Sequence, residues 1–117
     1  MRILFVESDK DLRAFFGSKL RDEFNGTIDM VATGKEAIKL LKSERPYDVI
    51  ISDYFLPKGS GVDLLHFKIK NEITGSFIFF CSSKGEIPYL KEENQQVDKF
   101  SFGLLCNEIR RNAERRK

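Results

Sequence analysis

Three short stretches of this chain contain only apolar residues, and they constrain its fold more than any other feature. They are Ile3–Val6, Val49–Ile51 and Phe77–Cys81. Uninterrupted apolar runs of this length, bounded by polar residues, are typical of strands buried on both faces of a parallel sheet. Thr27–Ala32 is a further candidate strand. A sheet of such strands needs a layer of helices on each face.

The segments between these strands repeat apolar residues at helical spacing. We predict a helix from Asp9, as N-cap, to about Phe24, and another after Thr33, where Glu36 completes a capping box. A third covers Ser60–Glu72, and a fourth pattern closes the chain. The side chains predicted to face inward are Leu12, Phe15, Phe16, Leu20, Phe24, Ala37, Leu40, Leu41, Val62, Leu65, Ile69, Phe102, Leu105, Cys106, Ile109 and Ala113. Strand and helix alternate, so we predict a doubly wound α/β domain with a five-stranded parallel sheet.

The stretch from Lys84 to Lys99 gives the weakest signal. Pro88 could start a helix, but only about two turns fit before Gln95. Val97 alone marks a strand. We therefore expect a short fifth strand, preceded by a short or irregular helix.

Length and composition restrict the function further. A chain of 117 residues suits one domain, 1–117, in which about 110–117 form the basic end of the last helix or the start of a linker. A net charge of +2 does not indicate a nucleic-acid binder. Cys81 and Cys106 have no partner at metal-ligand spacing and are interpreted as core residues in a reducing compartment. No signal pattern or membrane-spanning run is present, so we expect a cytoplasmic protein.

Polar residues follow the predicted strands. Glu7 and Asp53 follow the first and third, Ser82 the fourth and Lys99 the fifth. Open α/β sheets bind ligands at the carboxyl ends of their strands. Converging carboxylates there would attract a hard divalent cation such as Mg²⁺. A carboxylate held by the ion could accept a phosphoryl group, whose oxygens a hydroxyl and an ammonium could bind.

The order of these residues resembles a known family. Asp53 is followed by Leu56-Pro57 and then Gly61, and the acidic run Glu7-Ser8-Asp9 follows the first strand. This pattern resembles the receiver domain of two-component response regulators, the CheY-like family, over nearly the whole chain. The resemblance implies the flavodoxin-like (βα)5 receiver fold. It also implies that a histidine kinase phosphorylates Asp53.

The resemblance assigns further roles. Mg²⁺ would be held by Glu7, Asp53 and the backbone carbonyl of Phe55, with a contribution of Ser8 or Asp9 left open. Ser82 and Lys99 would contact the phosphoryl group as switch residues. Phe55, an apolar neighbour of the acceptor, and Lys84 would tune autodephosphorylation. Because Phe55 can shield an acyl phosphate from water, we expect the phosphoryl group to be lost slowly.

The chain departs from the family pattern at three positions. Ser8 replaces a carboxylate that normally contacts the metal, so we expect weak Mg²⁺ affinity. Gln96 stands where the family has an aromatic switch residue, and Phe100 where it has a cis proline. These departures favour an alternative function, a degenerate pseudo-receiver that binds proteins without being phosphorylated.

Each candidate residue also has a simpler structural interpretation. Asp53 could accept hydrogen bonds from loop amides, Glu7 could pair with Lys99, Asp9 could act only as an N-cap, and Ser82 could form a turn. His66 is interpreted as a partly exposed helix residue rather than a phosphoryl carrier. A hydrolase with an aspartyl intermediate is disfavoured, because Phe55 stands where such an enzyme needs a second carboxylate.

The favoured function is a signalling switch rather than an enzyme with turnover. Its chemistry would be limited to self-phosphotransfer and slow autodephosphorylation. The expected partners are a histidine kinase or phosphotransfer protein and a downstream effector or fused output domain. A homodimer stays open, contact of this domain with nucleic acid is disfavoured, and no membrane partner is expected.

Overall fold

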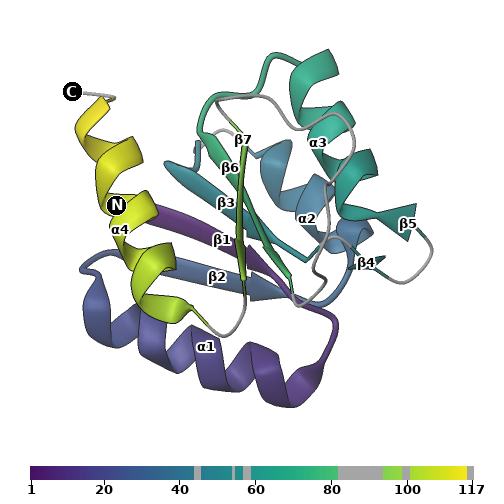
Figure 1. Cartoon of the computed structure of the whole chain (residues 1–117). Helices are drawn as coiled ribbons and strands as arrows, with labels where there is room; N and C mark the ends of the chain where they lie inside the picture. Colours follow the sequence, from purple (N-terminus) through teal and green to yellow (C-terminus); the bar gives the residue numbers. More distant parts are fainter. Residues whose placement is uncertain (44–45, 54, 57–58, 82–93, 99–100, 116–117) are drawn as a thin grey trace.

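The computed structural model describes residues 1–43, 46–53, 55–56, 59–81, 94–98 and 101–115. Its centre is a parallel sheet of five strands in the order β2-β1-β3-β6-β7. The strands are β1 (Arg2–Val6), β2 (Thr27–Val31), β3 (Val49–Ser52), β6 (Ser76–Cys81) and β7 (Asn94–Asp98). The predicted doubly wound α/β fold is confirmed (Figure 1), and β7 takes the place of the predicted fifth strand with as many residues as β1.

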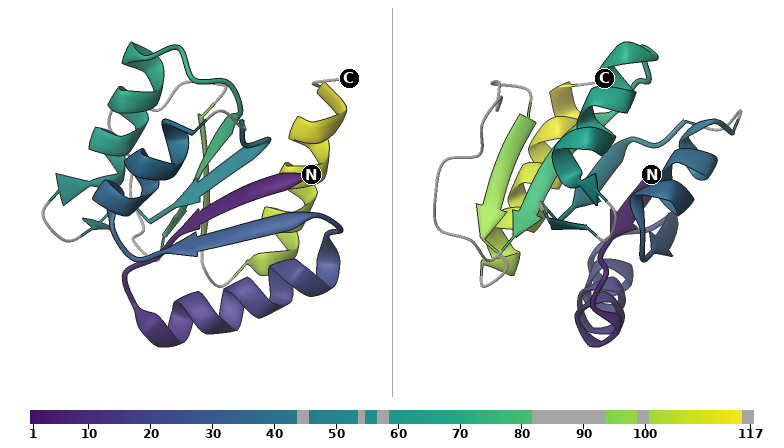
Figure 2. Two further views of the ribbon diagram at one scale, coloured as in Figure 1. Left: turned by 180° about the vertical axis from the view of Figure 1, so that it is seen from behind. Right: turned by 90° about the vertical axis from the view of Figure 1, so that its right-hand side faces the viewer.

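Helices cover both faces of this sheet (Figure 2). They are α1 (Lys10–Glu23), α2 (Gly34–Leu41), α3 (Gly61–Lys70) and α4 (Phe102–Arg115). One core cluster joins the sheet to α2 and α3, and a second joins it to α1 and α4. None of the helices in the described part of the chain is long and apolar enough to cross a membrane.

The buried strands divide their side chains between the two clusters. In β1, Leu4 and Val6 face α2 and α3, whereas Ile3 and Phe5 face α1 and α4. The same alternation runs through β3 and β6, because successive side chains of a strand point to opposite faces. The predicted apolar runs Ile3–Val6 and Val49–Ile51 are therefore buried, as the sequence predicted, whereas Ser52 at the end of β3 is a buried polar residue.

The predicted caps begin the first two helices. Asp9 accepts a hydrogen bond from the Leu12 N–H at 2.9 Å and caps α1, as an N-cap aspartate does. Thr33 accepts one from the Glu36 N–H at 3.1 Å and caps α2. The Glu36 carboxylate accepts a hydrogen bond from the Thr33 hydroxyl at 3.0 Å.

Two inward-facing predictions are wrong. Phe15 is 56% exposed and Ile69 is 51% exposed. The buried line of α1 runs through Phe16, Gly17 and Leu20, so the neighbouring Phe15 turns about 100° away from the sheet. The buried residues of α3 all lie in its first half, whereas Ile69 belongs to its last turn.

One small element was not predicted. After Asp53, β4 (Phe55–Leu56) pairs antiparallel with β5 (Gly59–Ser60) directly before α3. The predicted third helix therefore starts at Gly61 and is shorter than expected. The expected short or irregular helix falls on 82–93, outside the described residues.

Candidate functional site

Glu7 is a buried carboxylate at the end of β1. Its N–H donates to the Val31 carbonyl at 3.0 Å, so Glu7 continues the pairing of β1 with β2. The residue is only 1% exposed, and its Oε2 accepts a hydrogen bond from the Asp9 N–H at 3.1 Å. Burial of an acidic group is unfavourable unless polar or charged groups surround it. It lies at the carboxyl end of a parallel strand, where open α/β sheets bind their ligands.

Asp53 lies at the end of the neighbouring strand, β3. Its N–H donates to the Val6 carbonyl at 3.2 Å, and the residue is partly buried. Val6 pairs with Ser52 in the register of β1 and β3, so Glu7 and Asp53 are the next residues on adjacent strands. Adjacent strands are about 4.8 Å apart. The two acids therefore share the carboxyl edge of the sheet, as predicted.

The rest of the acidic loop has a different role. Ser8 and Asp9 are exposed, and the Asp9 side chain caps α1. Arg13, one turn into α1, donates from Nη1 to the Glu7 carbonyl at 2.9 Å and to the Ser8 carbonyl at 3.4 Å. The sequence reasoning missed Arg13, although its place six residues after Glu7 puts it on the turn of α1 nearest the loop.

The donor set at this edge suits a hard cation. Among the described residues no group of three or more His, Cys, Asp or Glu side chains is placed to hold a metal ion. Two carboxylates are nevertheless sufficient for Mg²⁺, which keeps several water ligands and prefers oxygen. The buried acidic Glu7 beside Asp53 therefore fits Mg²⁺, and Phe55 starts β4 just beyond them.

Several predicted site residues lie outside the described structure. They are Ser82, Lys84, Lys99 and the side chain of Phe55, and the same holds for Phe100 and the side chain of Gln96, two departures from the family pattern, and for the side chain of Cys81, a predicted core residue. Ser82 directly follows β6, Lys99 directly follows β7, and Phe55 begins β4. The structure describes the ends of these strands. His66 is exposed on α3, as expected of a surface helix residue.

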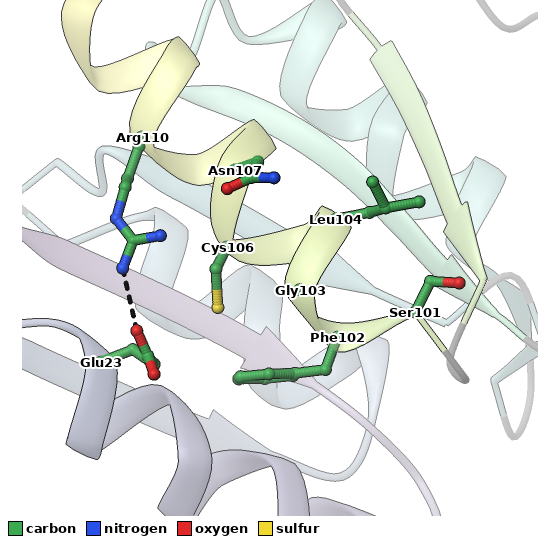
Figure 3. Close-up of a pocket in the computed structure, with 8 residues that line it drawn as sticks. All are labelled: Glu23, Ser101, Phe102, Gly103, Leu104, Cys106, Asn107 and Arg110. Atoms are coloured by element: carbon green, nitrogen blue, oxygen red, sulfur yellow. Dashed lines mark hydrogen bonds and ion pairs between the residues drawn. The ribbon is translucent and has the colours of Figure 1, made fainter.

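A surface pocket lies elsewhere, between α1 and α4 (Figure 3). Arg110 bridges the two helices there through a 2.9 Å ion pair with Glu23. Burial and the nearby Glu23 raise the pKa of the Cys106 thiol in its wall. Neither Glu7 nor Asp53 lines this pocket, so it is separate from the acidic edge of the sheet.

Comparison with known proteins agrees with this fold. Residues 3–99 match the family model for the response regulator receiver domain. A histidine kinase, P4, of Formosa agariphila is 40% identical over 76 residues, which are 65% of this chain and 5% of that protein. The chain thus spans about one-twentieth of this relative's length.

Two solved receiver structures illustrate the similarity of fold. The receiver domain of a Francisella response regulator has a TM-score of 0.84 at 24% identity, covering 99% of this chain and 98% of that one. The response regulator TrrA of Thermotoga maritima, solved with Mg²⁺-BeF, has a TM-score of 0.81 at 23% identity, covering 95% and 97%. The chain belongs to the response regulator receiver domain family of two-component systems.

Proposed function

We propose that this receiver domain is a phosphorylatable switch in which Asp53 accepts a phosphoryl group from a histidine kinase. The observation that carries the proposal is the buried carboxylate of Glu7 at the end of β1, directly beside Asp53 at the end of β3. Two carboxylates this close repel each other, and a bound divalent cation would offset that repulsion. Uptake of one phosphoryl group at Asp53 from a small-molecule donor tests the proposal.

In the proposed reaction a carboxylate oxygen of Asp53 attacks phosphorus. The P–N bond to the donor histidine breaks, and the histidine nitrogen keeps the electron pair. Mg²⁺ bound by Glu7 and Asp53 would offset negative charge on the transferring oxygens. Ser82 and Lys99 would bind those oxygens from the ends of β6 and β7, and the carbonyl of Phe55 would complete the metal site. The chain would catalyse this transfer to itself and lose the group slowly, without substrate turnover.

The partners follow from this reaction. The resemblance to a segment of a histidine kinase, and to the TrrA receiver solved with Mg²⁺-BeF, supports a kinase or phosphotransfer protein as donor. The phosphorylated surface would then be bound by an effector or by an output domain fused to the receiver.

A specific observation favours the second candidate function, a receiver that only binds proteins. Ser8 is neutral and exposed, and the Asp9 carboxylate caps the N-terminus of α1 by accepting a hydrogen bond from the Leu12 N–H. Within the described residues 7–9, Glu7 thus has the one buried carboxylate. Titration with Mg²⁺ separates the two functions, because the phosphorylatable switch binds the ion and the binding-only receiver does not.

Substitution Ser8→Asp tests the cause of the weak Mg²⁺ affinity that we expect. An added carboxylate beside Glu7 should tighten Mg²⁺ binding about fivefold or more, because it contributes at least ~1 kcal/mol of Coulomb attraction at contact distance. Isothermal titration calorimetry measures the change. Ser18→Asp is the matched control, since Ser18 is exposed on α1, more than about 10 Å along the helix from the loop. Equal affinities for the two variants would contradict a local role of Ser8.

A further inference from the structure

The main-chain carbonyl of Asp53 is enclosed by two residues that the proposed reaction does not use. Ser52, the last residue of β3, is fully buried, and its Oγ donates a hydrogen bond to the Asp53 oxygen at 2.8 Å. Gly61, the first residue of α3, approaches the same oxygen. A Cβ atom at position 61 would lie 2.3 Å from it, closer than any real contact. The main-chain oxygen of Asp53 thus accepts a hydrogen bond from Ser52 and is closely approached by Gly61.

The ring of Phe79 also lies close to Gly61. Its register partner in β3 is Ser52, and its ring would lie 2.8 Å from a Cβ at Gly61. Phe79 is fully buried in the core between the sheet, α2 and α3. The Asp53 carbonyl and the Phe79 ring therefore leave no room for a side chain at position 61.

The preceding peptide unit is anchored as well. The Asp53 N–H donates to the Val6 carbonyl at 3.2 Å, which ties Asp53 to β1. With both main-chain groups of Asp53 held, its carboxylate retains only the two side-chain torsions. A nucleophile that is already oriented reacts faster, because less orientational freedom is lost on the way to the transition state.

We propose that Ser52 and Gly61 are positioning residues that hold the main chain of Asp53 for phosphoryl transfer. The inference rests on the proposed function of Asp53 as acceptor. Ser52 contributes the hydrogen bond, and Gly61 contributes the close approach of α3. Neither residue contacts the phosphoryl group, so each acts only through the orientation of Asp53.

The first test uses substitutions at Ser52. Thr and Val have nearly the same shape and differ in the hydroxyl, so any steric strain is common to Ser52→Thr and Ser52→Val. Labelling by acetyl phosphate with saturating Mg²⁺ is followed by intact mass over a range of donor concentrations. The limiting rate should be about three- to tenfold lower for Ser52→Val than for Ser52→Thr, the effect of one hydrogen bond. The half-saturating donor concentration and the Mg²⁺ affinity should not change.

The second test uses two glycines. Gly61→Ala should slow labelling more than Ser52→Val does, because the new methyl group must displace the Asp53 carbonyl. Gly103→Ala, in the first turn of α4, is the matched control, since a Cβ there meets nothing within 4 Å. It should label at the wild-type rate. Thermal unfolding of each variant shows whether a slow rate comes from loss of fold.

The outcomes separate the two proposals. Equal limiting rates for Ser52→Thr and Ser52→Val, with a labelled wild type, would overturn the positioning role of Ser52 and leave Asp53 as acceptor. A folded Gly61→Ala variant that labels at the rate of Gly103→Ala would overturn the role of Gly61. A wild type that takes up no phosphoryl group would overturn the proposed function, and this inference with it.

Discussion

Replacing Phe16 by alanine is expected to lower the free energy of unfolding by about 3–5 kcal/mol. Phe16 is 6% exposed, and its ring lies 4.9 Å from that of Phe80 in an edge-to-face arrangement. It also stacks on Phe102 with 6.0 Å between ring centroids. One side chain thus joins α1, β6 and α4, and its removal leaves a cavity between three elements. Urea unfolding followed by circular dichroism measures the loss.

The neighbouring Phe15 provides the control for this prediction. It is 56% exposed, and its described ring contacts are the edge of Phe16 at 5.1 Å and the ammonium of Lys19 at 5.1 Å. Phe15→Ala should therefore lower the free energy of unfolding by less than about 1 kcal/mol. Similar losses for the two variants would show that α1 is rotated, with Phe15 as buried as Phe16.

Substitution Glu7→Gln is expected to weaken Mg²⁺ binding about tenfold or more, and to slow Mg²⁺-dependent labelling of Asp53 in proportion. The amide keeps the size of the side chain but removes the negative charge that would attract the ion. Calorimetric titration with Mg²⁺ gives the affinity, and intact mass gives the labelling rate. Unfolding in urea shows that the variant is folded at the temperature of the titration.

Asp9→Asn is the matched control in the same loop. Asparagine is as good an N-cap as aspartate, so α1 should retain its start. Because the Asp9 carboxylate accepts the Leu12 N–H, its replacement should change Mg²⁺ affinity less than about twofold at physiological salt. A loss equal to that of Glu7→Gln would instead identify Asp9 as a metal ligand, the role that the sequence left open.

Local patterns were sufficient to predict most of the fold. The apolar runs at Ile3–Val6 and Val49–Ile51 predicted doubly buried strands because a parallel sheet leaves neither face of its inner strands in water. Asp9 and Thr33 predicted the starts of α1 and α2 because capping depends on residues within one turn. Each of these features is decided by neighbours in the sequence.

Features that depend on distant contacts were not predictable. Phe15 and Phe16 are both apolar, and only the packing of α1 on the sheet, where Gly17 lies close to Met30, distinguishes the buried ring from the exposed one. Tyr47, unmarked by any motif, is buried where its hydroxyl donates to Asp29. Burial and that hydrogen bond raise the pKa of Tyr47 well above its usual range.

The candidate site shows the same division. Glu7 and Asp53 could be placed at one edge because the carboxyl ends of parallel strands meet there. The contacts of Ser52 and Gly61 with the Asp53 carbonyl could not be predicted, because they depend on how closely the start of α3 approaches the end of β3. Arg13 was missed for a related reason, since its partners are main-chain carbonyls, which the sequence pattern does not reveal.

Intact-mass measurement after incubation with acetyl phosphate and Mg²⁺ tests the central claim most directly. The wild-type chain should gain one phosphoryl group. It should gain none when Mg²⁺ is removed with a chelator, and Asp53→Asn should gain none under any of these conditions. A wild type that stays unlabelled and binds no Mg²⁺, or an Asp53→Asn variant that is labelled as fast as the wild type, would contradict the assignment of Asp53 as the phosphoryl acceptor.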